Sequence, residues 1–403
     1  MNYPIVAKIP HGPCVRRRRA GPGVPFPRGD KALMLRTFIL CATLLSSALA
    51  RADIVIAQVS PTKGPLAVTA VGNYEGAKAY FDTVNAQGGI RGQMIRFVHE
   101  DDQYKPEETV RLIEVVAQRD SPVAFVNLFG SANVLAIQSS KVLEQVKIPA
   151  IGATPGAEAM RTPGSPWIYH VHAGDRSQIR HILQHLATLG LTRIAAAYQD
   201  NPFGKSGLRH FDEAAVEFKL DVAGRVPVPP VGEQLAATAG KLRATGAQAY
   251  VMLLVRNSGA ALVRDVRAAG DRTPMYGMSY VPAEALLEKV PLDAAVGVGL
   301  VQVVPNAGTE KTPLTREFRA AMRKFAPKSE PSNPHLTGYV AARVVVEAIR
   351  RAGPSPTPEK VAAAMRQLKF DLGGLPEDFT NGQNVGTQWA DIGVVDRRGQ
   401  LLY

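Results

Sequence analysis

Short apolar runs and amphipathic segments alternate along most of this chain. The apolar runs are typical of strands, and they lie at 53–59, 94–100, 122–128, 148–151, 193–199, 221–228 and 247–255. Apolar residues recur with the helical period at 106–119, 133–146, 176–189, 205–219, 233–244 and 258–269. This alternation of strand and helix predicts largely parallel, doubly wound sheets, and an unbroken apolar run such as AYVMLLV predicts a strand buried on both faces.

The segment from Asp53 to Lys105 carries the most informative local pattern. It contains a strand (DIVIAQV), a Pro/Gly turn (SPTKGP), a long helical pattern, a turn (NAQGGIRGQ), a second strand (MIRFVHE) and then DDQYKP. A buried strand that ends at such a turn and leads into a helix presents free backbone N–H groups at its carboxyl end. Open α/β sheets hold small ligands at that end, so the segment indicates one lobe of a receptor.

The pattern changes character at three places. PGSPWIYHVHAGDR (163–176) precedes a second alternating series, and after GVGLVQVVPNAG (297–308) the chain returns to helices. LGGLPEDFTNGQN (372–384) precedes a terminal strand hairpin, whose turn at Asp396–Gly399 has the expected composition. We interpret the three places as crossings between two lobes. The predicted domains are lobe 1, residues 53–171 and 305–378, and lobe 2, residues 172–304 and 379–403.

The N-terminal part is typical of an export signal. Residues 34–52 begin with a basic group at Arg36, continue with an apolar core and end with Ala50 and Ala52, which predicts cleavage after Ala52. No later run is apolar for the roughly 20 residues that a membrane span needs. We therefore expect a periplasmic protein. Residues 1–33 are interpreted as a disordered or mis-called extension, with a twin-arginine export signal as the alternative.

The composition indicates a globular protein and argues against nucleic-acid binding and disulfide bonds. The chain has 403 residues, 46% of them hydrophobic and 20% charged, which is typical of a globular protein of two domains. Its formal charge is +12, but residues beyond 52 hold 38 basic and 34 acidic side chains, too nearly balanced for a nucleic-acid surface. Both cysteines, Cys14 and Cys41, precede the predicted cleavage, so the mature chain is expected to have no disulfide.

Five motifs spread over 53–370 share one resemblance. They are SPTKGPLA, NYEGAKAYFDTVNAQGGIRGQMIRFVHEDDQYKPEETV, IPAIGATPGAE, YQDNPFGKSGL and LTGYVAARVVVEAIRRAG. In order and spacing they resemble the type I periplasmic solute-binding proteins of the leucine/isoleucine/valine-binding kind, the receptors of ABC uptake systems. The resemblance implies two doubly wound α/β lobes joined by a three-strand hinge that close on a small ligand. It also implies a membrane permease as the partner.

Two loops of lobe 1 offer donors for such a ligand. A small carboxylate needs N–H and hydroxyl groups that converge at a helix N-terminus. In FGSANV, Ser131, Ala132 and Asn133 follow a strand and begin a helix, although Ser131 as a plain N-cap is the alternative. In GATPGAE, the next loop, Thr154 and the backbone of Gly156 are candidates, although threonine is also a common turn former.

Lobe 2 contributes candidates from the carboxyl ends of its predicted strands. Phe203 matches a position where the resemblance implies an aromatic side chain that covers the ligand, and it lies between Pro202 and Gly204 at a strand-to-helix turn. A core position is the alternative for this phenylalanine. The remaining candidates of lobe 2 are Tyr198, Arg256, Asn257, Ser279 and Tyr280.

The charge of the ligand is left open by the sequence. The resemblance implies an acidic residue near Ser279 that holds an α-ammonium group, but MYGMSYVP has no carboxylate before Glu284, which belongs to a predicted helix. Because a buried ammonium without a counter-charge costs several kcal/mol, an organic acid or an amide suits the sequence at least as well as an amino acid. Arg256 is a candidate partner for an acid group, with a solvated surface arginine as the alternative.

The sequence gives little support for metal binding or catalysis. Two histidine pairs have spacings that could bind a metal, His181 with His185 and His170 with His172. Neither pair has a third ligand, so no metal site is expected. The acid pair of DDQYKP is assigned to helix initiation. The chain has no GxSxG, GxxxxGK[ST] or GxGxxG motif, so we expect no catalytic residues and no cofactor. The alternatives to a monomeric transport receptor are a periplasmic ligand sensor and, with less support, a hydrolase.

Overall fold

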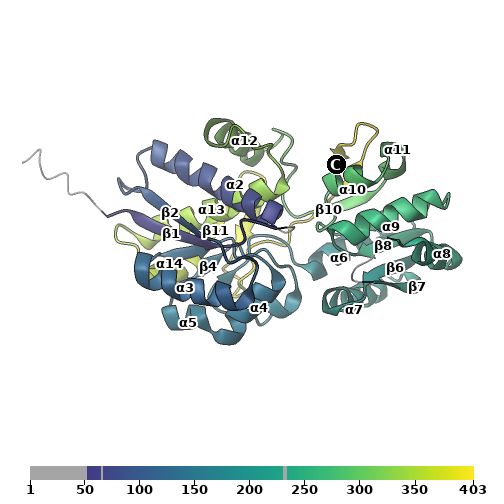
Figure 1. The fold of residues 1–403 in the computed structure, drawn as a ribbon, viewed down its shortest axis with the longest axis horizontal. Coiled ribbons are helices and arrows are strands. Elements are labelled where there is room, and N and C mark those ends of the chain that lie inside the picture. Colours follow the sequence, from purple (N-terminus) through teal and green to yellow (C-terminus); the bar gives the residue numbers. More distant parts are fainter. Residues whose placement is uncertain (1–51, 65–66, 230–233) are drawn as a thin grey trace, which may run out of the picture. The chain divides into compact units, whose positions relative to one another are not determined.

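The computed structural model describes residues 52–64, 67–229 and 234–403, all within one unit, Ala52–Tyr403. The predicted extension, both cysteines and the predicted signal peptide up to residue 51 lie outside the described residues. Two large sheets organise the described chain, and we call the parts around them lobe 1 and lobe 2 (Figure 1). The predicted α/β class with parallel-rich sheets in two lobes is confirmed.

The sheet of lobe 1 is parallel throughout its described strands, in the order β2-β1-β3-β4-β5. The strands are β1 (Ile54–Val59), β2 (Ile95–Glu100), β3 (Ala124–Val126), β4 (Ala150–Ile151) and β5 (Ile168–Tyr169). Successive side chains of a strand point to opposite faces. Accordingly, Ile54 and Ile56 of β1 belong to one core cluster, whereas Ala57 and Val59 belong to another. Both faces of the sheet are therefore buried.

Helices cover the two faces of this sheet (Figure 1). The helices of the first cluster are α2 (Ala67–Ala86), α12 (Pro313–Phe325), α13 (Asn333–Ala352) and α14 (Pro358–Met365). Those of the second are α3 (Pro106–Asp120), α4 (Ser131–Ser140) and α5 (Val142–Val146), with the 3₁₀ turn η1 (Glu158–Met160). The predicted helix at 133–146 is thus two helices, because Lys141 is left-handed with φ 55° and its N–H bonds to the carbonyl of Gln138.

The sheet of lobe 2 has the order β14-β13-β10-β9-β8-β6-β7. Its parallel strands are β6 (Arg193–Gln199), β7 (Asp221–Val228), β8 (Ala249–Leu253), β9 (Met275–Gly277) and β10 (Gly299–Gln302). The antiparallel strands β13 (Asp391–Val395) and β14 (Leu401–Leu402) form the predicted terminal hairpin, and β13 pairs with β10. As predicted for AYVMLLV, β8 is buried along its whole length.

Helices again lie on both faces. One core cluster includes α6 (Asp175–Thr188) and α7 (Pro202–Glu217), and the other includes α8 (Ala236–Ala244), α9 (Arg256–Ala268), α10 (Ala283–Lys289) and α11 (Leu292–Ala295). The helix α10 contains Glu284, which the sequence placed on a helix, whereas α11 was not predicted. With four residues, α11 is too short for a helical period to stand out in sequence.

The chain passes between the lobes after β5, after β10 and before β13. Just before the third passage, β11 (Lys369–Asp371) and β12 (Pro376–Asp378) form a small hairpin that the sequence did not predict. The first and third passages are joined, since His170 N–H donates to the Asn384 carbonyl at 2.7 Å and Gly386 N–H donates to the His170 carbonyl at 2.9 Å. These two crossings are thus tied to each other by backbone hydrogen bonds.

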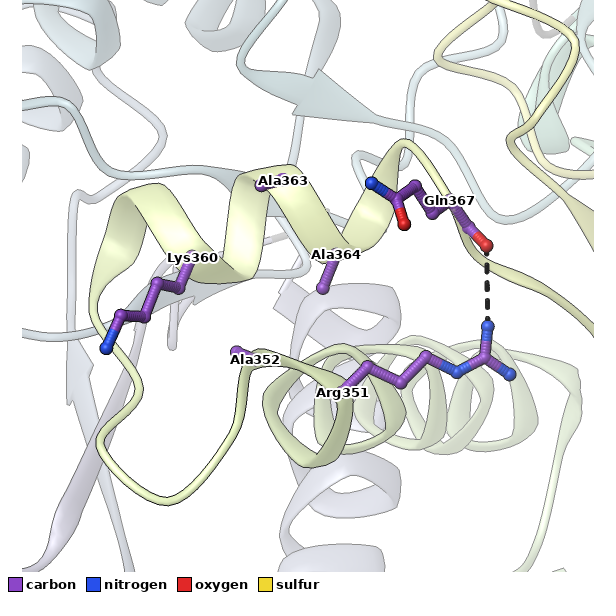
Figure 2. Close-up of a pocket in the computed structure, with 6 residues that line it drawn as sticks. All are labelled: Arg351, Ala352, Lys360, Ala363, Ala364 and Gln367. Atoms are coloured by element: carbon purple, nitrogen blue, oxygen red, sulfur yellow. Dashed lines mark hydrogen bonds between the residues drawn. The ribbon is translucent and has the colours of Figure 1, made fainter.

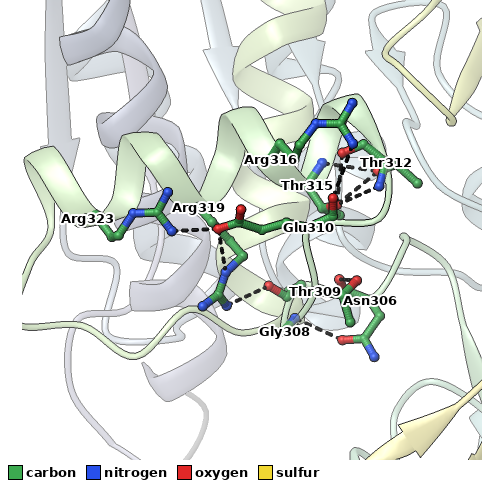
Figure 3. Close-up of polar contacts among 10 residues, drawn as sticks. Asn306, Gly308, Thr309, Glu310, Thr312, Thr315, Arg316, Arg319 and Arg323 are labelled. Carbon is green, nitrogen blue, oxygen red and sulfur yellow. Dashed lines mark hydrogen bonds and ion pairs between the residues drawn. The ribbon is translucent and has the colours of Figure 1, made fainter.

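Arginines of α12 hold the end of the second passage (Figure 3). Glu310 accepts a 2.6 Å hydrogen bond from Arg323 and lies 3.5 Å from Arg319. Arg319 also donates to the carbonyl of Ala307 at 3.3 Å, and Arg316 donates to the carbonyl of Glu310 at 3.2 Å. These contacts fasten the segment after β10 to the first helix that follows it.

Candidate functional site

The loop between β3 and α4 places Ser131 at the start of the helix. Gly130 is the N-cap, with φ 87°, and no side chain caps the helix. Ser131 is therefore the first helical residue, and its role in ligand binding stays a prediction. Ser131 and Ala132 are exposed. Their backbone N–H groups belong to the first turn, where an α-helix leaves its donors without intrahelical partners.

The side chain of Asn133 is buried inside lobe 1. Its amide group donates to Asp102 at 2.9 Å and to Thr109 at 2.8 Å. Its Oδ1 is buried without a hydrogen-bond partner among the described residues. The side chain thus connects the first turn of α4 to the loop before α3, and its place in the ligand site stays a prediction.

The loop after β4 brings a second group of donors to the same edge of the sheet. Thr154 N–H donates to the carbonyl of Leu128, which is the residue before the α4 loop, at 2.9 Å. The Oγ1 of Thr154 is buried and has no hydrogen-bond partner within the described chain. An unsatisfied buried hydroxyl is costly, so an ordered water or a ligand is its expected partner.

Gly156 meets lobe 2 directly. The N–H of Asp175, the first residue of α6, donates to the Gly156 carbonyl at 2.8 Å. A Cβ built on Gly156 would collide with Oδ1 of Asp175 and with the hydroxyl of Tyr280. A side chain at this position would therefore force Asp175 or Tyr280 to shift. Two of the predicted residues, Gly156 from lobe 1 and Tyr280 from lobe 2, are brought into contact.

Aromatic side chains continue this contact within lobe 2. Phe203 lies in the first turn of α7, where Asn201 caps the helix by accepting a hydrogen bond from Gly204. Its ring packs edge-on against Tyr280, with the ring centroids 5.4 Å apart. Tyr198 is half-buried at the end of β6 and packs against the same core cluster. Phe203 and Tyr280 thus form an aromatic pair beside Gly156.

The remaining predicted residues of lobe 2 have other partners. The N–H of Ser279 donates to Oε1 of Gln178 at 3.0 Å. Arg256 forms a 2.7 Å ion pair with Glu288. Asn257 is exposed, and its Oδ1 accepts from Lys289 at 3.4 Å. The structure therefore pairs Arg256 and Asn257 with the end of α10 and does not join them to the aromatic pair.

Two buried charges near Gly156 were missed by sequence reasoning. Asp175 is 2% exposed, and burial raises the pKa of its carboxyl to about 6. Arg161 is 4% exposed, and its guanidinium donates to the carbonyls of His172 at 2.8 Å and of Pro155 at 3.2 Å. Burial lowers the pKa of Arg161. The signals were weak: Asp175 appeared as a helix start, and Arg161 follows the GATPGAE motif by three residues.

The histidines that flank the first passage are structural in character. Burial, with the nearby Arg161 charge, lowers the pKa of His172 to about 4 and that of His170 well below its usual value. Both rings are therefore neutral near pH 7. Within the described ranges, no three histidine, cysteine, aspartate or glutamate residues are grouped as a metal site would require.

A surface groove of about 390 Å³ lies elsewhere, between the end of α13 and α14 (Figure 2). Its cationic side chains already have partners: Lys360 donates to the Ser355 carbonyl at 2.9 Å, and Arg351 donates to Glu347 at 3.0 Å. None of the predicted site residues lines it. The groove is not the candidate site. Among the described helices, none combines the length and the apolar character needed to cross a bilayer.

Two α/β lobes, with loops that meet at the carboxyl ends of their parallel strands, define the class of hinged solute-binding proteins. The family model of the periplasmic binding proteins matches residues 53–400. The chain belongs to this family. The resemblance seen in the sequence is thereby confirmed.

Individual relatives agree with this assignment. The Leu/Ile/Val-binding protein homolog 7 of Brucella suis is 24% identical over 378 residues, which cover 87% of this chain and 93% of the relative. An extracellular ligand-binding receptor from Verminephrobacter eiseniae is 34% identical, covers 87% of this chain and 100% of its own, and superposes with a TM-score of 0.81. A branched-chain amino acid ABC transporter protein from Thermus thermophilus, crystallised with valine, shares the fold at 22% identity, with 87% and 94% coverage and a TM-score of 0.75.

Proposed function

We propose that this protein is the solute receptor of an ABC-type uptake system, and that it holds a small organic molecule between loops of its two lobes and releases it unaltered. The observation that carries the proposal is the contact of Gly156 with Asp175 and Tyr280. Strand-end loops of both lobes converge there, and the loop that carries Gly156 also carries Thr154, whose hydroxyl is buried without a partner in the described chain. This is the arrangement that a hinged receptor needs, because the ligand must contact both halves to favour closure.

The lobe 1 half of the proposed site offers donors. Ser131 and the first N–H groups of α4 suit a carboxylate or an amide oxygen, because the N-terminus of a helix attracts negative charge. The hydroxyl of Thr154 adds a further donor or acceptor. The proposed lobe 1 residues remain Ser131, Ala132, Asn133, Thr154 and Gly156.

The lobe 2 half offers aromatic surface and a buried acid. Phe203 and Tyr280 supply the apolar wall, with Tyr198 beside them and with Ser279, Arg256 and Asn257 as the remaining proposed residues. Asp175 supplies the carboxylate that the sequence alone did not place near Tyr280. Asp175 and the buried Arg161 carry opposite charges, so a ligand without net charge suits the site best. We therefore propose a zwitterionic amino acid or an amide as the solute.

The signal-like segment at 34–52 and the family together support export to the periplasm, where a permease in the inner membrane is the proposed partner. A relative that was crystallised with valine supports the amino-acid class of ligand. The protein is proposed to act as a diffusing monomer without catalytic residues, cofactor or metal.

A thermal-shift screen over amino acids, amides, aromatic acids and dicarboxylates tests the proposal. A true ligand stabilises the native state by mass action, by about 2.7 kcal/mol at a concentration of 100 Kd, and raises the melting temperature. Mass spectrometry of the protein after incubation then shows whether the ligand is recovered unchanged. A hit that the protein converts to a product would replace the receptor with an enzyme, and a complete absence of hits would contradict the proposal.

A further inference from the structure

The loop before α3 has a backbone conformation that needs an explanation. Gln103 and Tyr104 are consecutive non-glycine residues with φ of 52° and 59°. Side-chain-bearing residues rarely adopt this left-handed region, and they persist in it where surrounding contacts over-determine the conformation. This loop belongs to the DDQYKP motif, whose acid pair the sequence assigned to helix initiation.

A buried carboxylate holds the loop. Asp102 is fully buried, and its Oδ1 accepts a 2.9 Å hydrogen bond from the N–H of Tyr104. Its Oδ2 accepts from the hydroxyl of Thr109 at 2.7 Å and from the side-chain amide of Asn133 at 2.9 Å. Asp102 thereby ties together the loop, the first turn of α3 and the first turn of α4.

With this left-handed backbone at Gln103 and Tyr104, the Tyr104 ring lies against the Gly130 turn that begins α4. A Cβ built on Gly130 would meet this ring, 3.0 Å from Cζ and 3.1 Å from the hydroxyl oxygen. Gly130 itself has φ 87° and immediately precedes Ser131. The ring also packs edge-on against Phe129 at a centroid distance of 6.2 Å. The Gly130 turn is thus covered on one side by Tyr104, while Asn133 anchors the helix to Asp102.

We propose that Tyr104, held by Asp102, is a positioning residue that fixes the turn at Gly130 and, through it, sets Ser131 and the first turn of α4 for the ligand. The proposal rests on the function proposed above, because Ser131 matters only if it contacts a ligand. In this proposal, Tyr104 raises the affinity for the ligand without contacting it. Removal of the Tyr104 ring is therefore expected to loosen the Gly130 turn and the first turn of α4.

Hydrogen exchange of the ligand-free protein tests the turn itself. In Tyr104→Ala, the peptide that covers residues 130–134 is expected to exchange about tenfold faster at its protected amide, Val134, whose N–H donates to the Gly130 carbonyl at 2.9 Å, because the local opening energy falls while most of the lobe is unchanged. Tyr104→Phe keeps the ring and is expected to exchange like the wild type. Tyr74→Ala is the matched control, since Tyr74 is another half-buried lobe 1 tyrosine, stacked on Phe97 and His99. It should leave 130–134 unchanged.

Affinity for the best hit of the screen is measured on the same variants. Tyr104→Ala is expected to weaken binding about tenfold, equivalent to roughly 1.4 kcal/mol, with Tyr104→Phe and Tyr74→Ala close to the wild type. Thr109→Val removes one hydrogen bond to Asp102 and should show the same changes to a smaller degree.

The possible results separate the two proposals. Unchanged exchange at 130–134 in Tyr104→Ala would overturn the inference whether or not a ligand is known. Faster exchange with unaltered affinity would overturn the positioning role, because the turn would then be irrelevant to the ligand. A wild-type protein that binds nothing in the screen would refute the proposed function, and the exchange experiment would still decide whether Tyr104 fixes the turn.

Discussion

The hydroxyl of Tyr280 donates a 2.6 Å hydrogen bond to Oδ1 of Asp175, 105 residues earlier in the chain. The backbone of Gly156 lies against both groups, and it accepts the Asp175 N–H at 2.8 Å. The bond therefore completes a contact between a loop of lobe 1 and two elements of lobe 2. Burial raises the pKa of Tyr280 well above its usual value, so its hydroxyl is a permanent donor in the physiological range.

Gly156→Ala is expected to disturb this contact. The new Cβ would overlap Asp175 and Tyr280, and inserting a carbon atom into a packed site typically costs about 1–3 kcal/mol. Denaturant unfolding should show that loss, and ligand affinity should fall because the lobes approach less closely. Gly240→Ala is the control, because Gly240 lies inside α8 with nothing within 4 Å of the added carbon. The unfolding free energy of this variant should equal that of the wild type or exceed it by up to about 1 kcal/mol. Equal behaviour of the two variants would contradict the steric argument.

Asp175→Asn is expected to change how stability depends on pH. Burial raises the Asp175 pKa from 3.8 to about 6, so the folded protein binds the proton more tightly than the unfolded chain. This carboxyl therefore favours folding below pH 4, and its contribution disappears as the pH rises through 6. Between pH 7 and pH 4, the wild type should gain about 2.4 kcal/mol of unfolding free energy relative to Asp175→Asn. Parallel pH profiles of the two proteins in urea unfolding would refute this expectation.

The pH dependence of stability that His172 contributes has the opposite sign to that of Asp175, so His172 is a control for the same measurement. Burial lowers its pKa from 6.5 to about 4, so its contribution to stability is present above pH 6.5 and is lost as the pH falls through 4. His172→Asn should therefore lose less stability on acidification than the wild type, by about 3 kcal/mol. The two substitutions should shift the pH profile in opposite directions.

Glu377 should make the protein sensitive to alkaline pH. It is 1% exposed, neither carboxylate oxygen has a hydrogen-bond partner among the described residues, and burial raises its pKa well above 4.5. Its contribution to stability is lost as the pH rises through this raised pKa, so Glu377→Gln should flatten the profile on the alkaline side. Asp378→Asn is the neighbouring control, because hydrogen bonding to Lys369 lowers the Asp378 pKa to about 2. Stability should be measured from pH 5 to 9, and a Glu377→Gln profile that matches the wild type would argue against a buried, neutral Glu377.

Cleavage after Ala52 is a further expectation, and N-terminal sequencing of protein purified from the periplasm measures it. The mature chain should begin at Asp53, one residue before β1. Sequencing that starts upstream of residue 34 would contradict both the predicted start and the predicted signal.

The regular elements were predictable because their signals are local. Strands such as β6 and β8 are continuous apolar runs, and α3 and α13 repeat apolar residues with the helical period. The site was predictable only in part. Gly156 and Tyr280 were expected near the ligand, but the nearness of Asp175 depends on a contact across 105 residues, which no local pattern encodes. Arg256 was proposed for a ligand acid, whereas its partner Glu288 lies 32 residues further along, and no local pattern encodes that pairing.

The most direct measurement is a calorimetric titration of the best screen hit against Thr154→Val from lobe 1 and Phe203→Ala from lobe 2. Thr154→Val removes a buried hydroxyl without a partner in the described chain, so the ligand-free protein should be no less stable, yet affinity should fall by about 1–3 kcal/mol. Phe203→Ala should weaken the same ligand, whereas the controls Thr188→Val and Phe218→Ala, at surface and half-buried positions of lobe 2, should bind like the wild type. Loss of affinity in both site variants, one on each lobe, is the predicted result. Wild-type affinity in both would contradict a ligand held between the two lobes.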